Sequence, residues 1–348
     1  MLNISKELEK ASKNGGADIR KVYYNFKNVL ETNINIDRVS SDFTPNSIVL
    51  IGGGSGVSTV GRSLYKIGIP NFTSIASVMD VGGGSGVVQD AFGIPHMNDV
   101  MQHLININPI KNDLANFMAL RTSYAWKQDG YLVLAAAIEM FGMGKGVDFI
   151  SHSLENIHRS LPVTEQPCEP IFTYRDVKYG TYEFAFLHGR IGVADHTELN
   201  IAAKILPEAS ISIRNADIVI LGPGDVHFSI LPPILITETR EALDNIRKVI
   251  LVANLTAREI DIPGFTLKNF ISFWKERLPK KPEYHIIVNS SLNINQENRP
   301  LKDDVQGDCY KGYYIHRAAI AGVSVSRNQQ LLHDETMLGE FLFRLIKA

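Results

Sequence analysis

Short apolar runs alternating with glycine-rich loops mark the start of the main domain. The run at 47–51 precedes a glycine loop at 52–56, and apolar residues at helical spacing follow over 57–67. A second run at 72–78 leads into another glycine-rich loop at 80–86. Strand, glycine loop, helix and strand in this order are typical of a parallel sheet with crossover helices. The pattern therefore predicts an α/β domain that begins near residue 47.

The pattern of apolar strands followed by helices returns towards the C-terminus, after a segment with a different pattern. Residues 160–215 contain short alternating runs separated by turn residues, which predict a β-rich insertion with antiparallel pairs. Apolar periodicity and length predict further strands at 216–221, 248–253 and 285–288, and helices at 98–107, 112–127, 131–138, 229–246, 266–278 and 334–347, of which the helix at 229–246 is broken by Pro232 and Pro233. We expect one α/β domain over 47–348 with a mainly parallel sheet.

Residues 1–46 predict an addition in front of this domain. Apolar side chains recur at helical spacing over 17–31, so this segment is expected to form an amphipathic helix. The stretch 33–47 is rich in Asn, Ser and Asp and is expected to be a linker. The N-terminal segment is thus interpreted as a helical extension.

Composition narrows the class of protein. The 348 residues are 45% hydrophobic and 21% charged with a formal net charge of −2, which predicts a globular protein and no nucleic-acid partner. Two cysteines, Cys168 and Cys309, fit a reducing cytoplasm and no disulfide scaffold. No apolar stretch reaches about 18 residues, so no membrane span is expected. The ten histidines lack metal-ligand spacing, and neither zinc, haem nor a flavin prosthetic group is expected.

The hexapeptide Gly-Gly-Gly-Ser-Gly-Val occurs twice, at 52–57 and at 82–87. Glycine loses much backbone freedom on folding, and such loops occur where bare N–H groups approach a ligand closely. At the end of a strand and the start of a helix, this predicts phosphate binding; a tight strand-to-helix turn is the alternative. The spacing matches neither the Rossmann nor the Walker A motif. The first loop contributes these candidate ligand-binding residues: Gly52, Gly53, Gly54, Ser55 and Gly56.

Two carboxylates accompany the second loop. Asp80 precedes the glycines, where it is a candidate ligand for a magnesium ion, a partner for a ribose hydroxyl or an acceptor of a reacting proton, with an Asx-turn as the alternative. Asp99 opens an apolar-periodic helix and is either an N-cap or a second catalytic carboxylate if the protein is an enzyme. The loop itself contributes the candidate ligand-binding residues Gly82, Gly83, Gly84 and Ser85.

Later strands end in similar residues. Gly222, Gly224 and Asp225 follow the strand at 216–221, and Asn254 directly follows the strand at 248–253. The carboxyl ends of parallel strands meet at one edge of a sheet, where open α/β sheets bind their ligands. We therefore expect the four segments to form one site for a phosphorylated small molecule.

In this order, the segments resemble the 2-phospho-L-lactate transferase (CofD)-like superfamily, most closely its gluconeogenesis-factor (YvcK-like) branch. The resemblance covers about 47–346 and rests on four stretches: Ile48–Gly56, Val78–Gly86, Phe92–Asp99 and Ile220–Asp225 followed by Ser229–Pro232. The chain departs from the family pattern mainly at polar positions around the second loop: Val81, Gly84, His96, Met97, Asn98, Met101 and Gln102.

The resemblance implies a Rossmann-like three-layer α/β/α fold, often dimeric, with a nucleotide or nucleotide sugar in the glycine-loop cleft. For the gluconeogenesis-factor branch it implies a uridine diphosphate (UDP) sugar and a regulatory role in carbon metabolism or cell-envelope and shape control. For the transferase branch it implies a magnesium-dependent enzyme that moves phospholactate from a guanylyl-linked donor to a deazaflavin alcohol. The lost carboxylate at Val81 favours the regulatory interpretation.

Overall fold

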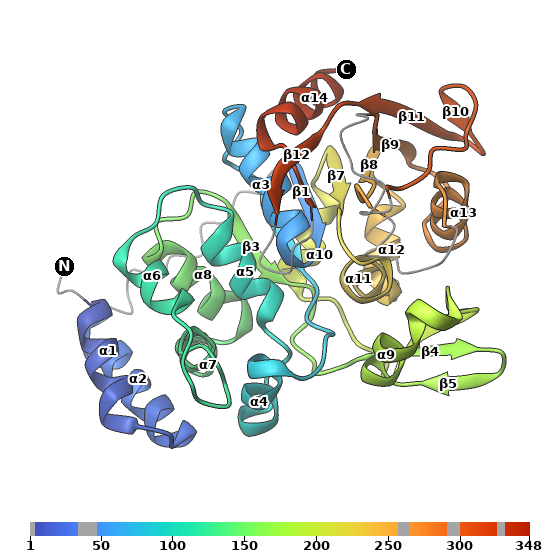
Figure 1. Ribbon diagram of the computed structural model, residues 1–348. Coiled ribbons are helices and arrows are strands. Elements are labelled where there is room, and N and C mark those ends of the chain that lie inside the picture. The colour runs from blue at the N-terminus through green and yellow to red at the C-terminus, as the bar shows by residue number, and fades with distance from the viewer. Residues whose placement is uncertain (1–3, 34–46, 257–264, 291–299, 326–330) are drawn as a thin grey trace.

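The structure, a computed structural model, describes residues 4–33, 47–256, 265–290, 300–325 and 331–348 (Figure 1). An eight-stranded sheet forms its centre. All pairings in the sheet are parallel except that of β10 with β11. From one edge to the other, the strands are β10 (Cys309–Tyr310), β11 (Tyr313–Ala318), β9 (Glu283–Asn289), β8 (Lys248–Val252), β7 (Ile218–Leu221), β1 (Ile48–Gly52), β2 (Thr73–Ala76) and β3 (Arg159–Pro162).

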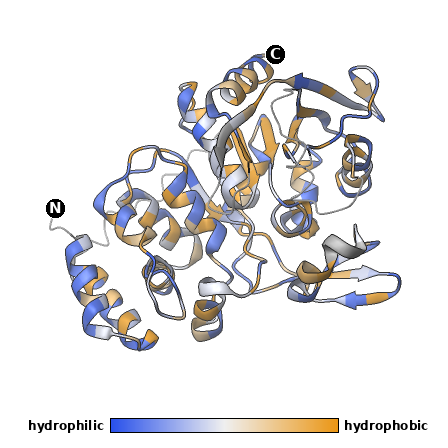
Figure 2. Cartoon of the chain, in the orientation of Figure 1, coloured by the Kyte–Doolittle hydropathy of each residue, from blue (hydrophilic) through white to orange (hydrophobic). Residues whose placement is uncertain are grey.

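Helices cover both faces of this sheet. Val49 and Ile51 of β1 belong to one hydrophobic core, whereas Ile48 and Leu50 belong to a second. Successive side chains of a strand point to opposite faces, so two separate cores on alternate residues indicate a sheet buried on both sides. The central strands are correspondingly hydrophobic (Figure 2). The predicted Rossmann-like α/β fold with a mainly parallel sheet is confirmed.

The second core lies under α3 (Gly54–Lys66) and α14 (Glu335–Lys347). The first core lies under a larger group of helices: α5 (Asn98–Asn106), α6 (Asp113–Ala119), α7 (Gly130–Phe141), α8 (Met143–Ser153), α10 (Pro207–Arg214), α11 (Leu231–Leu235), α12 (Thr237–Leu243) and α13 (Leu267–Arg277). The helix expected at 112–127 is shorter than predicted and ends at Ala119. The helical segment expected at 229–246 is interrupted, as predicted, and consists of a π-helical turn (Val226–Ile230), α11 and α12, although both prolines lie in the first turn of α11.

The segment 160–215 contains more helix than the sequence pattern suggests. It includes a three-stranded antiparallel sheet of β4 (Pro170–Tyr174), β5 (Val177–Tyr179) and β6 (His196–Leu199), as expected. However, the alternating run that begins at Tyr182 lies in α9 (Thr181–Ile191), not in a strand. The helix buries Phe184 against Phe172 of β4, with ring centroids 4.2 Å apart. This tertiary contact explains why the alternating run folds as a helix.

The N-terminal segment forms a pair of helices, α1 (Ile4–Gly15) and α2 (Ile19–Asn33), beside α7 (Figure 1). The helix expected at 17–31 is α2, whereas α1 was not predicted. Tyr23 of α2 stacks on Phe92, the last residue of α4 (Gly83–Phe92), at 4.2 Å between ring centroids. The expected linker lies almost wholly outside the described residues. Among the described helices, none is both long and apolar enough to cross a membrane.

Candidate functional site

The order of the strands reverses between β1 and β7. Strands β2 and β3 follow β1 on one side, and β8 and β9 follow β7 on the other. The connections on the two sides diverge at such a switch point, which leaves a crevice outside the carboxyl ends of the strands. The first glycine loop and the Gly222–Gly224 turn both lie here. The Gly222 N–H donates to the carbonyl oxygen of Ile51 over 3.2 Å and ties the turn to the end of β1.

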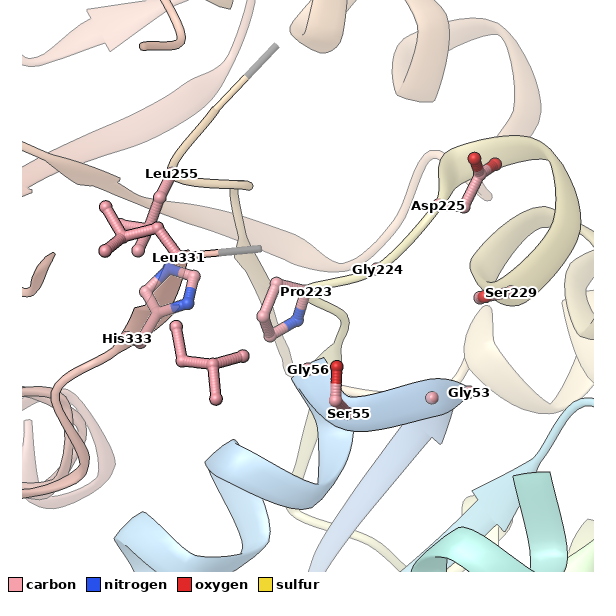
Figure 3. Close-up of a pocket in the computed structure, with 12 residues that line it drawn as sticks. Gly53, Ser55, Gly56, Pro223, Gly224, Asp225, Ser229, Leu255, Leu331 and His333 are labelled. Atoms are coloured by element: carbon pink, nitrogen blue, oxygen red, sulfur yellow. The ribbon is translucent and has the colours of Figure 1, made fainter. Parts of the chain in front are cut away.

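A cavity of about 160 Å³ opens between these two segments. Figure 3 shows Asp225 and Ser229 at one end, with Leu255, Leu331 and His333 at the other. Pro223 and the first turn of α3 lie between the two ends. The cavity therefore has a polar end and an apolar end, joined by backbone of the glycine loop.

Close contacts explain two of the glycines in the first loop. A Cβ on Gly56 would lie 2.2 Å from the Pro223 carbonyl oxygen, and one on Gly53 would lie 1.8 Å from Asp99 Oδ2. Both distances are far below van der Waals contact, so a side chain on Gly56 would require backbone movement, and one on Gly53 would displace the Asp99 carboxyl group. Gly54 has a φ of +70°, which glycine adopts without strain. The loop thus satisfies the requirements of a tight turn, and its backbone also lines the cavity.

Asn254 and Asp225 both hold backbone in place. The Asn254 side chain accepts from Gly224 N over 2.9 Å and donates to the Gly224 carbonyl over 3.0 Å. It is 3% exposed and does not line the cavity. Asp225 Oδ1 accepts from the backbone N–H groups of His227 and Phe228 and caps the π-helical turn. Asn254 therefore holds the turn at 222–224 in position without lining the cavity, whereas Asp225 caps the π-helical turn and also lines the cavity.

The apolar end of the cavity was missed by the sequence analysis. Leu331 and His333 belong to β13 (Leu331–His333), a short strand paired with β12 (Ala321–Val325) outside the main sheet. The three residues of β13 have no flanking glycine motif, so the sequence pattern did not indicate that they line a site. His333 Nε2 donates to the Ala253 carbonyl over 3.2 Å, and burial lowers the pKa of its imidazole to about 4. The ring is consequently neutral at physiological pH.

Asp99 lies against the first loop rather than acting as a helix cap. Its Oδ1 accepts from Gly54 N over 3.0 Å, and its carboxyl group is 9% exposed. Burial, strengthened by the negative charge of Asp80, raises the pKa of Asp99 to about 7, although the bonds from Gly54 and Asn98 oppose this rise. A carboxyl group with this pKa can hold or release a proton near neutral pH.

The second glycine loop does not join the first cavity. Gly82, Gly83, Gly84 and Ser85 line a separate cavity of about 220 Å³ together with Asp80. A Cβ on Gly84 would lie 2.1 Å from the Trp126 carbonyl oxygen, so this glycine is required for packing against the loop at 121–128. The remaining lining residues, apart from Val81, were missed by the sequence analysis: His96, Asn98, Arg121, Lys127, Gln128 and Tyr131.

The acidic pair separates the two cavities. Asp80 lines the second cavity, while Asp99 contacts Gly53 and Gly54 of the first. The charge of Asp99 also raises the pKa of Tyr131, which lines the second cavity, although burial is the larger cause. The structure thus brings the predicted site residues to one edge of the sheet but divides them between two neighbouring cavities.

Magnesium is the only metal that the sequence analysis suggested. Among the described residues, no group of three His, Cys, Asp or Glu side chains is placed to hold a metal ion. Mg²⁺ commonly uses one or two carboxylates together with water and substrate phosphates. Asp80 and Asp99 supply hard oxygen ligands and a shared negative charge, so the residues present fit such an ion.

Comparisons with known proteins agree with this architecture. A family model described as 2-phospho-L-lactate transferase CofD matches residues 48–321. A curated protein of Thermoanaerobacterium thermosulfurigenes, provisionally named gluconeogenesis factor, is 26% identical over 319 residues, covering 86% of this chain and 97% of its own. A Thermotoga maritima protein with the same provisional name is 26% identical over 248 residues, covering 70% of this chain and 78% of its own.

A crystal structure of a Bacillus halodurans protein is similar in fold. It superposes with a TM-score of 0.75 at 20% sequence identity, covering 86% of this chain and 100% of that chain. A second crystal structure from the same organism, described as a member of the UPF0052 family, gives a TM-score of 0.72 at 19% identity and covers 86% of this chain and 99% of its own. At these identities the likeness extends to the fold alone.

Proposed function

Because the chain belongs to the CofD family, and within it to the gluconeogenesis-factor branch, we propose that it binds a nucleoside-diphosphate-type ligand, such as a UDP-sugar. Its role would be regulatory, in carbon metabolism or in control of the cell envelope and shape. Binding would occur in the cytoplasm, in a protein that forms a homodimer.

One observation carries the proposal: the cavity at the strand-order switch point has different chemistry at its two ends. Between its ends, backbone of the first glycine loop and of Pro223 and Gly224 meets the N-terminus of α3. N–H groups at a helix N-terminus attract phosphate through hydrogen bonds and the helix dipole. At the apolar end, Leu255, Leu331 and Leu332 form an apolar surface. A nucleotide has the same division between charged phosphates and a flat ring.

The proposed orientation follows from this division. The phosphates lie on the backbone of Gly53–Gly56, and the base lies against Leu331 and His333. Ser229 and Asp225 at the polar end are within the cavity wall and would contact the sugar or a terminal phosphate. Because its imidazole ring is neutral, His333 would contact the base without repelling or attracting the phosphates.

Calorimetric titration with UDP and with inorganic diphosphate tests this orientation. If the leucines contact the base, UDP should bind more tightly than diphosphate, and Leu331→Asp should remove most of that difference. A buried leucine contact contributes roughly 1.5–3 kcal/mol, so UDP affinity should fall by about tenfold or more. Ile211→Asp, at a position that is 46% exposed and outside the cavity, is the matched control. Equal affinities for UDP and diphosphate in the unaltered protein would contradict the proposal.

A second function, magnesium-dependent transfer of phospholactate, is favoured by the acidic pair. Burial, strengthened by the charge of Asp80, raises the pKa of Asp99 to about 7, and such a buried acidic pair is costly unless a cation or a reacting proton uses it. A bound Mg²⁺ would neutralise this charge and polarise a phosphoryl oxygen. Asp80 would hold the ion, and Asp99 would hold the transferred proton.

Turnover separates the two functions. The transferase interpretation expects release of guanosine monophosphate from the guanylyl-linked donor when the deazaflavin acceptor and Mg²⁺ are present, and loss of that release in Asp80→Asn. The regulatory interpretation expects ligand binding with no release of product in either protein. Tight UDP-sugar binding without turnover would reject the transferase function while leaving the binding function standing.

A further inference from the structure

The second cavity has the features of a separate ligand site. Its floor is the N-terminus of α4, a ten-residue helix whose N-cap position, Gly82, provides no capping side chain. The first N–H groups of a helix have no partner within the helix and carry partial positive charge. In contrast, the Gly54 N–H at the start of α3 donates to Asp99 Oδ1. The start of α4 therefore faces the cavity with its backbone donors uncapped by any side chain.

Two nearly buried side chains strengthen this arrangement. Ser85 is 3% exposed, and its Oγ accepts from Met97 N over 2.8 Å, which leaves its own hydroxyl proton to donate. His96 is 4% exposed, and its Nε2 donates to the Gly82 carbonyl over 3.0 Å. No hydrogen-bond partner is present for His96 Nδ1 among the described residues. Buried polar groups normally have partners, so the unpartnered Nδ1 of His96 points to a ligand that donates a hydrogen bond to it, such as a hydroxyl or a protonated oxyanion.

Charge on the walls favours an anion. Arg121 and Lys127 line the cavity, against a single carboxylate from Asp80. Arg121 is close enough to Tyr131 for its charge to oppose the burial that raises the pKa of the tyrosine. Asp80 Oδ1 accepts from its own neighbour, Val81 N, over 2.8 Å. Two cations, one carboxylate and an uncapped helix start leave a net positive surface.

We propose that this cavity binds a second small ligand through a phosphate-type oxyanion, independently of the nucleotide. Gly83, Gly84 and Ser85 would donate to its oxygens, and Arg121 would add a planar pair of donors suited to phosphate. Lys127 contributes charge at the mouth. Asp80 accepts from a hydroxyl of the same ligand. The proposal goes beyond the nucleotide site, because the lining residues of the two cavities do not overlap.

Equilibrium dialysis with labelled inorganic phosphate tests this site. Phosphate binding is measured with and without saturating UDP, in the unaltered protein and in Arg121→Gln/Lys127→Gln. The control, Lys10→Gln/Lys145→Gln, removes the same charge from two exposed helix positions outside the cavity. Loss of charged hydrogen bonds should weaken phosphate binding by about tenfold or more in the cavity variant and leave the control unchanged. Melting curves of both variants confirm that each is folded.

The outcomes are distinguishable from failure of the nucleotide proposal. Phosphate bound in the presence of UDP and lost in the cavity variant supports the second site. Phosphate that UDP displaces, or that binds the cavity variant as tightly as the control, overturns it. If UDP does not bind at all, the nucleotide proposal fails, and the comparison of the two variants still decides whether the second cavity holds the oxyanion.

Discussion

The hydroxyl of Ser12 in α1 donates a hydrogen bond to Oδ2 of Asp129, 117 residues later in the chain. Oδ1 of the same carboxylate accepts from Trp126 Nε1 over 2.8 Å, and Asp129 is 4% exposed. The carbonyl of Trp126 lies against Gly84 of the second loop. The N-terminal helix pair is therefore connected through three residues to the wall of the second cavity.

Ser12→Ala should lower the free energy of unfolding by about 1–3 kcal/mol, because it leaves one oxygen of a buried carboxylate without a donor. Urea denaturation followed by circular dichroism measures this change. Ser123→Ala, at an exposed position in the loop that contains Trp126, should change stability by less than about 0.5 kcal/mol. Equal effects of the two substitutions would show that Ser12 does not anchor the loop.

Gly56→Ala should abolish UDP binding, because the new Cβ would lie 2.2 Å from the Pro223 carbonyl and would separate the two walls of the first cavity. Gly68→Ala provides the matched control. Gly68 has a φ of +77° and no atom within 4 Å of a new Cβ, so only backbone strain of about 1–2 kcal/mol is expected, with UDP affinity retained. Titration calorimetry on both variants checks this. Retained UDP affinity in Gly56→Ala would be incompatible with the site.

Asp99 should make stability depend on pH in the metal-free protein. Its pKa is about 7 in the folded state and near the ordinary 3.8 when unfolded, so the folded protein binds more protons between these values. Stability from this group therefore falls as pH rises from about 4 to about 7 and then levels off, with a slope of at most about 1.4 kcal/mol per pH unit. Asp99→Asn keeps an oxygen for Gly54 N and removes this slope.

Denaturation at pH 5 and pH 8 measures the effect of Asp99→Asn. The free energy of unfolding of the variant minus that of the unaltered protein should be larger at pH 8 than at pH 5. Asp90→Asn, at an exposed position on α4, should shift neither value. A stability difference that is the same at both pH values would place the Asp99 carboxyl group in a more hydrated setting than the structure does.

Asn254→Ala should weaken UDP binding without removing a ligand contact. The side chain makes both of its hydrogen bonds to Gly224, so its loss frees the turn and leaves a partly buried N–H and carbonyl without this partner. Stability should fall by about 1–3 kcal/mol. Asn245→Ala loses one exposed bond to the Glu241 carbonyl and serves as the control. If Asn254→Ala alters stability but not UDP affinity, the position of the turn does not matter for binding.

The sequence was sufficient to predict the centre of the parallel sheet because β1 and β7 are short, continuously apolar and followed by glycines. The outer strands β3 and β11 contain polar and charged residues and were not predicted as strands of this sheet. Leu50 and Ile51, for example, are buried on opposite faces of the sheet, which requires an uninterrupted apolar run. The run from Tyr182 was misleading because alternation in a short amphipathic helix resembles a strand. Tertiary contacts of Phe184 with Phe172 of β4 and with Phe228 accompany the helical structure, and periodicity alone does not encode them.

Part of the candidate site could also be predicted. Both glycine loops and Asp99 lie at the carboxyl edge of the sheet, as the strand–loop order indicates. The division into two cavities was not predictable, since it depends on Trp126 packing against Gly84 and on a strand order that periodicity does not encode. The sequence around His333 contains no motif, so its place in the wall of the first cavity could not be predicted.

The contact between Gly56 and Pro223 has a mechanical consequence. The two segments come from opposite sides of the reversed strand order, yet they touch so closely that neither can shift without the other. The first cavity thus has a rigid corner, and separation of β1 from β7 is not available to widen it. A bulkier ligand would be accommodated by displacing β13, which pairs with β12 alone among the strands of the described residues. The β13 wall would then determine the largest ligand that the cavity accepts.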